Sequence, residues 1–144
     1  MEKYKKTYQL LLGLVILLGL GLLIGCPVDD DSVSVSERIS RFESAINAGG
    51  ANAGNHIHPA APGADQADTA AYWQSYFPTD RGEVYSIGSP SSLGSDVYET
   101  TINGGTFVSN DRLRFTMRED GSDNWKINRI EQTGSISRVI FPES

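Results

Sequence analysis

The fold is decided by two neighbouring stretches, RLRFTMR at residues 112–118 and WKINRIEQ at residues 125–132. In the first stretch Leu113, Phe115 and Met117 alternate with polar residues, which is the period of a strand with one buried face and one outward face. The second stretch leads into another strand, and the turn-forming segment DGSDN separates the two. The pair therefore predicts an antiparallel hairpin whose outward face carries arginines.

The same alternation extends over the rest of the second half of the chain. From Gly82 onward Val, Tyr, Ile, Thr and Phe are separated by clusters of Gly, Asn, Asp and Ser. Strands are expected over 83–88 and 96–102, and a further short one over 136–141. Together with the hairpin, these segments predict an antiparallel sheet of about four strands.

Residues 34–50 predict an amphipathic helix. Ser34 and Glu37 have the spacing of a capping box, in which each side chain satisfies the backbone N–H of the other residue. Apolar residues recur at helical spacing at Ile39, Phe42 and Ile46. The charged residues Arg38, Arg41 and Glu43 are expected on the outer face. The Gly-Gly pair at 49–50 ends the helix.

Two further segments precede the sheet. Residues 51–63 are rich in Ala, Asn, Gly and Pro and predict a short helical turn followed by a loop. Residues 65–77 predict a second helix, with Asp65 or Asp68 as its cap and Pro78 after its end. Helices followed by antiparallel strands predict an α+β domain.

Residues 1–25 have the pattern of an export signal, with three lysines near the start followed by an apolar run. The run ends in Leu23-Ile24-Gly25-Cys26, which resembles the lipobox of bacterial lipoproteins. The resemblance implies that the thiol of Cys26 receives a diacylglycerol and that the preceding bond is cleaved. It also implies that the new N-terminus is acylated.

An uncleaved transmembrane anchor and an ordinary secretory signal are the alternatives. The apolar run has 15 residues, whereas a spanning helix needs roughly 20. An Ala-x-Ala-like cleavage site is absent, and the chain has a single cysteine. We therefore expect a signal peptide at 1–25, a lipidated cysteine with a flexible tether at 26–33, and one domain at 34–144. This organisation places the protein at the cell membrane or outer membrane, facing the extracytoplasmic space.

The charge of the chain excludes one class of partner. The formal net charge is −6, and removal of residues 1–25, with three lysines and one glutamate, makes it −8. Nine scattered basic residues are too few for the phosphate-neutralising stripe that nucleic-acid binding needs. A like-charged anionic bilayer is also expected to repel the domain.

The hairpin carries a resemblance to a known family. The sequence from Leu113 through Glu119-Asp120-Gly121 to the run WKINRI at 125–130 is similar to the closing hairpin of the NTF2-like superfamily. The resemblance covers about 34–132 and includes the dipeptide His58-Pro59. It implies a curved sheet wrapped around helices as a cone. The space between them serves some members as an enzyme site and others for ligands or dimer contacts.

In such a cone, aromatic residues are the side chains expected to point inward. Those of this chain are Tyr72, Trp73 and Tyr76 from the second helix and Tyr98, Phe115 and Trp125 from the sheet. We expect them to form core first of all, because six large rings fill a cavity of this size. The alternative is an aromatic-walled pocket for an apolar or sugar-like ligand, with tyrosine hydroxyls as polar contacts.

The sequence assigns no catalytic residue, cofactor or metal ligand. A cone-type enzyme would need a carboxylate base, for which the candidates are Asp96, Glu99 and Glu131, with His56 or His58 at the mouth. Glu99 is expected on the outward face, in a cross-strand pair with Arg112 or Arg114. Zinc binding by the two histidines would need a third ligand that the sequence does not supply, and surface or capping roles are favoured.

Three functions remain open. The favoured one is a lipid-anchored, non-catalytic module that binds an apolar small ligand or an envelope protein. The second is a small cone-fold enzyme. The third is an assembly subunit that dimerises through the outward sheet face, where Arg112, Arg114 and Arg118 would meet an acidic surface. We expect this arginine stripe to be mostly a solvated face, with homodimerisation open.

Overall fold

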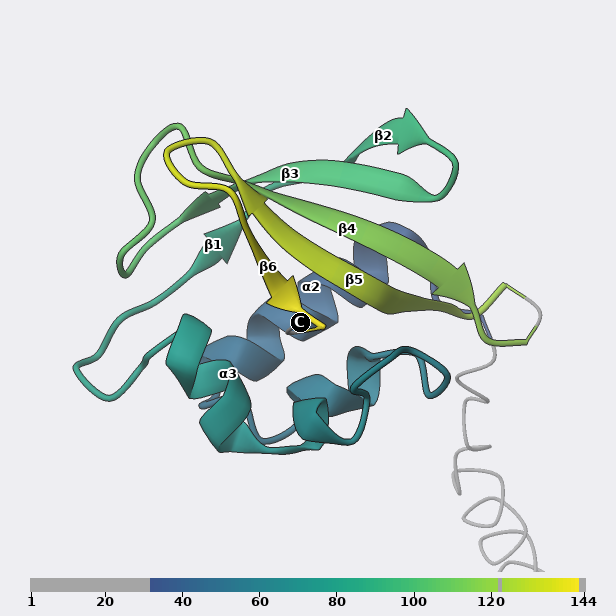
Figure 1. Ribbon diagram of the computed structural model, residues 1–144, viewed down its shortest axis with the longest axis horizontal. Coiled ribbons are helices and arrows are strands. Elements are labelled where there is room, and N and C mark those ends of the chain that lie inside the picture. The colour runs from purple at the N-terminus through teal and green to yellow at the C-terminus, as the bar shows by residue number, and fades with distance from the viewer. Residues whose placement is uncertain (1–31, 122, 143–144) are drawn as a thin grey trace, which may run out of the picture. The chain divides into compact units, whose positions relative to one another are not determined.

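The computed structural model describes residues 32–121 and 123–142. The predictions for the signal peptide, the lipobox and Cys26 lie outside the described residues. Within the described part, helices form one layer and an open antiparallel sheet forms the other (Figure 1). The α+β class predicted from the sequence is therefore confirmed.

The helical layer contains two α-helices and two short 3-10 helices. They are α2 (Val35–Asn47), η2 (Ala53–His56), η3 (Gln66–Asp68) and α3 (Ala70–Tyr76). One half of the predicted capping box is confirmed, since Ser34 Oγ accepts a hydrogen bond from Glu37 N at 3.3 Å, while the Glu37 carboxylate pairs with Arg41. The predicted cap of the second helix is wrong. Asp65 and Asp68 belong to the η3 turn, and the extended residue Thr69 caps α3 through Tyr72 N at 3.3 Å.

The sheet has six strands, so the prediction of about four was too low. They are β1 (Ser86–Ile87), β2 (Ser91–Gly94), β3 (Val97–Asn103), β4 (Arg112–Glu119), β5 (Trp125–Thr133) and β6 (Arg138–Phe141). The order is β1-β3-β4-β5-β6, with β2 also paired to β3. Strand β2 was missed because its Ser- and Gly-rich sequence resembles a loop. It joins β3 through Ser95 and Asp96, whose φ values of 50° and 61° suit a tight two-residue hairpin turn.

The free edge of β5 is covered by two segments from the first half of the chain. β6 pairs only with the C-terminal part of β5, from Ile130 to Gln132. Nearer the start of β5, Trp125 N donates to Val33 O at 3.0 Å, and His58 N donates to Ile127 O at 2.8 Å. These contacts satisfy edge groups that would otherwise stay open. They also fix the helical layer to the β4–β5 turn.

The inner face of the sheet forms the core with the helices. Leu113, Phe115 and Met117 are buried as predicted. The ring of Phe42 from α2 packs edge-on against Trp73 from α3 at 5.1 Å and against Phe115 from β4 at 6.1 Å. Rings from both layers therefore meet in one continuous core.

A buried carboxylate joins the loop before β4 to the loop before β6. Asp111 is 1% exposed, and its Oδ2 accepts from Val108 N at 2.9 Å. Its Oδ1 accepts from the backbone N–H and the hydroxyl of Ser135 at 2.9 and 2.5 Å. Gly134, with φ of 116°, allows this approach because a Cβ there would collide with the carbonyl of Asn110. The hydrogen bonds from Ser135 and Val108 lower the pKa of Asp111.

The Asp111→Asn variant is expected to be less stable at neutral pH by about 2 kcal/mol, because the amide loses charge-assisted hydrogen bonds. A carboxyl group whose pKa is lower in the folded state stabilises the fold above its unfolded pKa and loses this effect as the pH falls through the folded pKa. The stability gap between wild type and variant should therefore narrow as the pH falls below about 4. Urea unfolding at pH 7 and pH 3 measures both gaps, and an equal gap at the two pH values would contradict the assignment.

Candidate functional site

The six aromatic residues predicted to face a pocket belong to the core or to its margin. Trp73 and Phe115 are both 0% exposed, and the indole Nε1–H of Trp73 donates to Ala67 O at 2.6 Å. The other four, Tyr72, Tyr76, Tyr98 and Trp125, are partly buried and pack against the core. None of the six lines the surface hollows that lie beside Ile39, Lys126 and Glu99. The geometry favours the core interpretation of this aromatic set over the pocket interpretation.

The two tyrosines of α3 also use their polar or π-electron character within the fold. The hydroxyl of Tyr72 donates to Ile140 O at 2.5 Å. The guanidinium of Arg138 lies 5.4 Å from the ring centre of Tyr76. Both contacts dock α3 onto β6, the last strand. The Tyr72 hydroxyl and the Tyr76 ring therefore stabilise the fold. The sequence had instead suggested tyrosine hydroxyls as polar contacts for a ligand.

The three carboxylates considered for acid–base chemistry lie outside the core. Asp96 is exposed in the β2–β3 turn. Glu99 lies on the outward face and pairs with Arg114 at 3.1 Å, one of the two partners predicted. Glu131 pairs with Arg129 at 2.9 Å. The structure brings none of them together with an apolar cavity.

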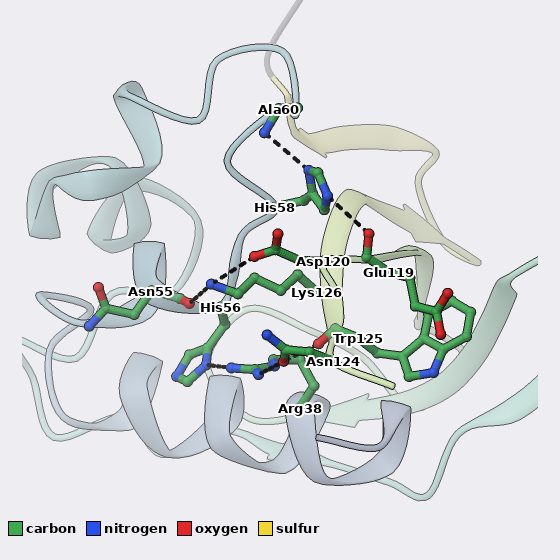
Figure 2. A network of polar contacts seen from close by, with 10 residues as sticks. All are labelled: Arg38, Asn55, His56, His58, Ala60, Glu119, Asp120, Asn124, Trp125 and Lys126. Carbon is green, nitrogen blue, oxygen red and sulfur yellow. Dashed lines mark hydrogen bonds and ion pairs between the residues drawn. The ribbon is translucent and has the colours of Figure 1, made fainter. Parts of the chain in front are cut away.

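The two histidines, His56 at the end of η2 and His58 just after it, extend in opposite directions (Figure 2). His58 Nδ1 accepts from Ala60 N at 3.0 Å, so its Nε2 carries the proton and donates to Glu119 O at 3.2 Å. His56 Nδ1 accepts from the Arg38 guanidinium at 3.1 Å. Each ring is engaged with different partners. In residues 32–121 and 123–142, no three His, Cys, Asp or Glu side chains group as a metal site would require.

Arg38 was predicted on the outer face of α2, and this prediction is wrong. The residue is 4% exposed. Its Nε donates to Trp125 O at 2.7 Å and its Nη2 to Asn124 Oδ1 at 2.8 Å (Figure 2). The spacing of Arg38, Phe42 and Ala45 could have revealed this position, since residues four and seven apart share a helix face. Arg38 thus joins α2 to the β4–β5 turn.

A surface hollow with a volume of about 470 Å³ lies beside Lys126. Its wall combines small or apolar residues with charged ones, namely Gly54, Asn55, Ile57, Pro59, Ala64, Asp65, Asp68 and Lys126. The ammonium of Lys126 lies 3.4 Å from Asn55 O and 3.7 Å from the Asp120 carboxylate (Figure 2). The hollow is open to solvent and lacks aromatic walls, so it differs from the pocket that the sequence suggested.

The outward face of the β4–β5 hairpin collects charged side chains. The alternation that buries Leu113 and Phe115 turns Arg112, Arg114 and Arg118 outward. Glu99 on β3 and Glu131 on β5 both lie directly opposite Arg114. The predicted arginine stripe therefore exists. It is bordered on both sides by carboxylates.

Comparison of this chain with protein-family models, with curated proteins and with solved structures found no match. Among the described residues, no helix combines the length and the apolar character needed to cross a bilayer.

Proposed function

We propose that this protein is a lipid-anchored, non-catalytic protein-interaction module of the cell envelope. The filled interior carries the proposal. The largest side chains of both layers, including Phe42, Trp73 and Phe115, are fully buried against one another. A domain of this kind recognises other molecules through its surface. The resemblance to the NTF2-like cone is retained as part of the proposal, supported by one sheet face covered with helices.

The anchor is the part of the proposal that rests on the lipobox. Stable anchoring requires more than one membrane-binding group. A diacylglycerol on Cys26 together with a further acyl chain meets this requirement. Val33 begins the described fold at the β4–β5 turn, seven residues after Cys26. The domain would thus be tethered close to the bilayer surface.

The Cys26→Ser variant is expected to carry no lipid. It should therefore be missing from the membrane proteins that detergent extracts from the cells. Fractionation of cells that express the chain, followed by mass measurement of the mature N-terminus, tests this directly. The matched control is the double variant Cys26→Ser, Ser36→Cys, which keeps one cysteine in the chain but moves it out of the lipobox. A membrane-bound Cys26→Ser protein, or a lipidated control, would contradict the anchor.

Cross-linking in intact envelopes tests the interaction role. A photo-reactive residue is placed in turn at Thr101 on the outward sheet face, Leu93 on β2 and Glu43 on α2, a set that samples both layers. We expect covalent adducts with a second protein from at least one position. Turnover of a small substrate by the purified chain, with no protein adduct from any position, would favour the enzyme alternative.

A further inference from the structure

Five of the nine lysine and arginine residues in the described part lie on the outward face of the β4–β5 hairpin. They are Arg112, Arg114, Arg118, Lys126 and Arg129, and together they are called the basic face here. The register explains the grouping, because Lys126 lies directly opposite Arg118, and Arg129 lies opposite Thr116. Directly opposed residues of an antiparallel pair share one side of the sheet. The pairing therefore adds Arg129 to the three arginines of β4, and it places Lys126 at the margin of this face, where its ammonium extends toward Asn55 O and the Asp120 carboxylate.

The positive charge of the basic face is only partly neutralised within the chain. Three carboxylates approach it, in the pairs Arg114–Glu99 at 3.1 Å, Arg129–Glu131 at 2.9 Å and Lys126–Asp120 at 3.7 Å. Arg112 donates to the carbonyls of Ser109 and Asp111 and so keeps its full charge.

Two groups on the basic face have unused hydrogen-bonding capacity. Arg118 is exposed and has no hydrogen bond or ion pair with any described residue. The Nε atom of Arg114 also has no acceptor within the described part, but it is buried, so a docking partner reaches only the exposed end of this guanidinium. Exposed guanidinium groups are suited to paired hydrogen bonds with carboxylates.

The charge of this face is opposite to that of the protein as a whole. The chain has a formal net charge of −6. Six acidic residues lie on the helical layer and the loop that follows it, at Glu37, Glu43, Asp65, Asp68, Asp80 and Glu83. The basic face is therefore a positive patch on an otherwise acidic domain, and such a patch steers a partner of complementary charge toward it.

We propose that the basic face is the docking surface for an acidic segment of another protein. The inference rests on the proposed function and names its partner by chemistry. Stacking of two copies through this face would bring like charges together, which disfavours the symmetric dimer. The uncharged outward residues Thr101, Thr116 and Thr133 are polar, and the exposed apolar residue beside them is the single leucine Leu93 on β2, whereas lipid-surface binding favours a set of exposed Trp, Phe and Leu. Carboxylates of a protein segment fit the guanidinium groups best.

The test uses the full chain in uncharged detergent micelles. The probe is a short fluorescein-labelled peptide of alternating glutamate and serine, and a glutamine version serves as its neutral control. Fluorescence anisotropy measures binding over a range of salt concentrations. Arg118→Glu is the main variant, because this side chain has no partner within the described fold. Arg81→Glu is the matched control, since it makes the same change in net charge at an exposed position outside the basic face.

We expect the glutamate peptide to bind, with affinity that falls as salt rises, and Arg118→Glu to weaken binding about tenfold. The Arg81→Glu variant should remain within about twofold of wild type. Equal loss in both variants, or equal binding of the neutral peptide, would overturn the proposal. Salt-sensitive self-association that requires Arg118 would assign the face to a second copy. Protection of β4 from hydroxyl-radical footprinting by phosphatidylglycerol nanodiscs alone would assign it to lipid. Either result would overturn the proposal.

The two proposals can fail separately. Protein adducts from Glu43 or Leu93, without binding of the acidic peptide, would keep the interaction module and remove the basic face as its docking surface. Peptide binding that depends on Arg118, without protein adducts in the envelope, would instead count against the interaction role in the cell.

Discussion

The Arg38→Ala variant is expected to lower the free energy of unfolding by about 3 kcal/mol, because it removes hydrogen bonds between a buried charged group and the β4–β5 turn. The guanidinium donates to the Trp125 carbonyl, to the Asn124 side chain and to the His56 ring at 2.7, 2.8 and 3.1 Å. These acceptors come from a strand, a turn and a 3-10 helix. Urea unfolding followed by far-UV circular dichroism measures the loss.

The matched control for Arg38 is Arg41→Ala in the same helix. The Arg41 side chain is 40% exposed and pairs with Glu37 across one helical turn at 2.7 Å. Exposed pairs of this kind contribute about 0.3–0.5 kcal/mol. Similar losses of stability in the two variants would mean that the Arg38 contacts drawn in Figure 2 do not hold the layers together. Arg38→Lys should recover only part of the stability, since an ammonium cannot reproduce the planar guanidinium fork.

The Trp73→Ala variant should be destabilised by about 4 kcal/mol, because it leaves a large cavity in a filled core. The indole packs against Phe42, Tyr72 and Phe141 at ring-centre distances of 5.1, 5.1 and 6.2 Å. The variant also lacks the hydrogen bond that the indole N–H donates to Ala67 O. Urea unfolding of the variant, again followed by circular dichroism, gives the size of the loss.

Trp125→Ala provides the comparison for Trp73. Trp125 is partly buried at the start of β5 and packs against the margin of the core. The Trp125→Ala variant should be destabilised by only about 1–2 kcal/mol, because the partly buried Trp125 covers less apolar area than the fully buried Trp73. If Trp73→Ala costs no more than Trp125→Ala, the indole lines an open pocket. The ligand-binding hypothesis from the sequence would then regain its basis.

Local sequence patterns were sufficient for most of the elements. The alternation at 112–118 predicted which residues of β4 are buried, since a strand has no other way to place one apolar set on one side. The Ser34 cap and the stop at 49–50 also depend only on neighbouring backbone groups. Strand β2 escaped prediction because its turn relies on left-handed conformations at Ser95 and Asp96, which carry weak sequence signals.

The candidate sites depended on contacts between distant segments. The sequence offered six aromatic residues for a pocket, but only the packing of α2 and α3 against β4 decides whether the rings leave space. Similarly, the alternation in the sequence of β4 predicted that its three arginines share the outward face. The register of β5 then determined that Lys126 and Arg129 join them.

The sequence by itself determined the α+β class, the faces of the main strands and the prediction of a lipid anchor at Cys26. These features follow from short-range periodicity and from a local motif. Only the tertiary structure decided that Arg38 is buried, that the interior is filled and that five cations share one sheet face. Those properties arise from hydrogen bonds and packing between residues far apart in the chain, such as Arg38 and Trp125, and no local pattern encodes which distant acceptor a side chain will meet.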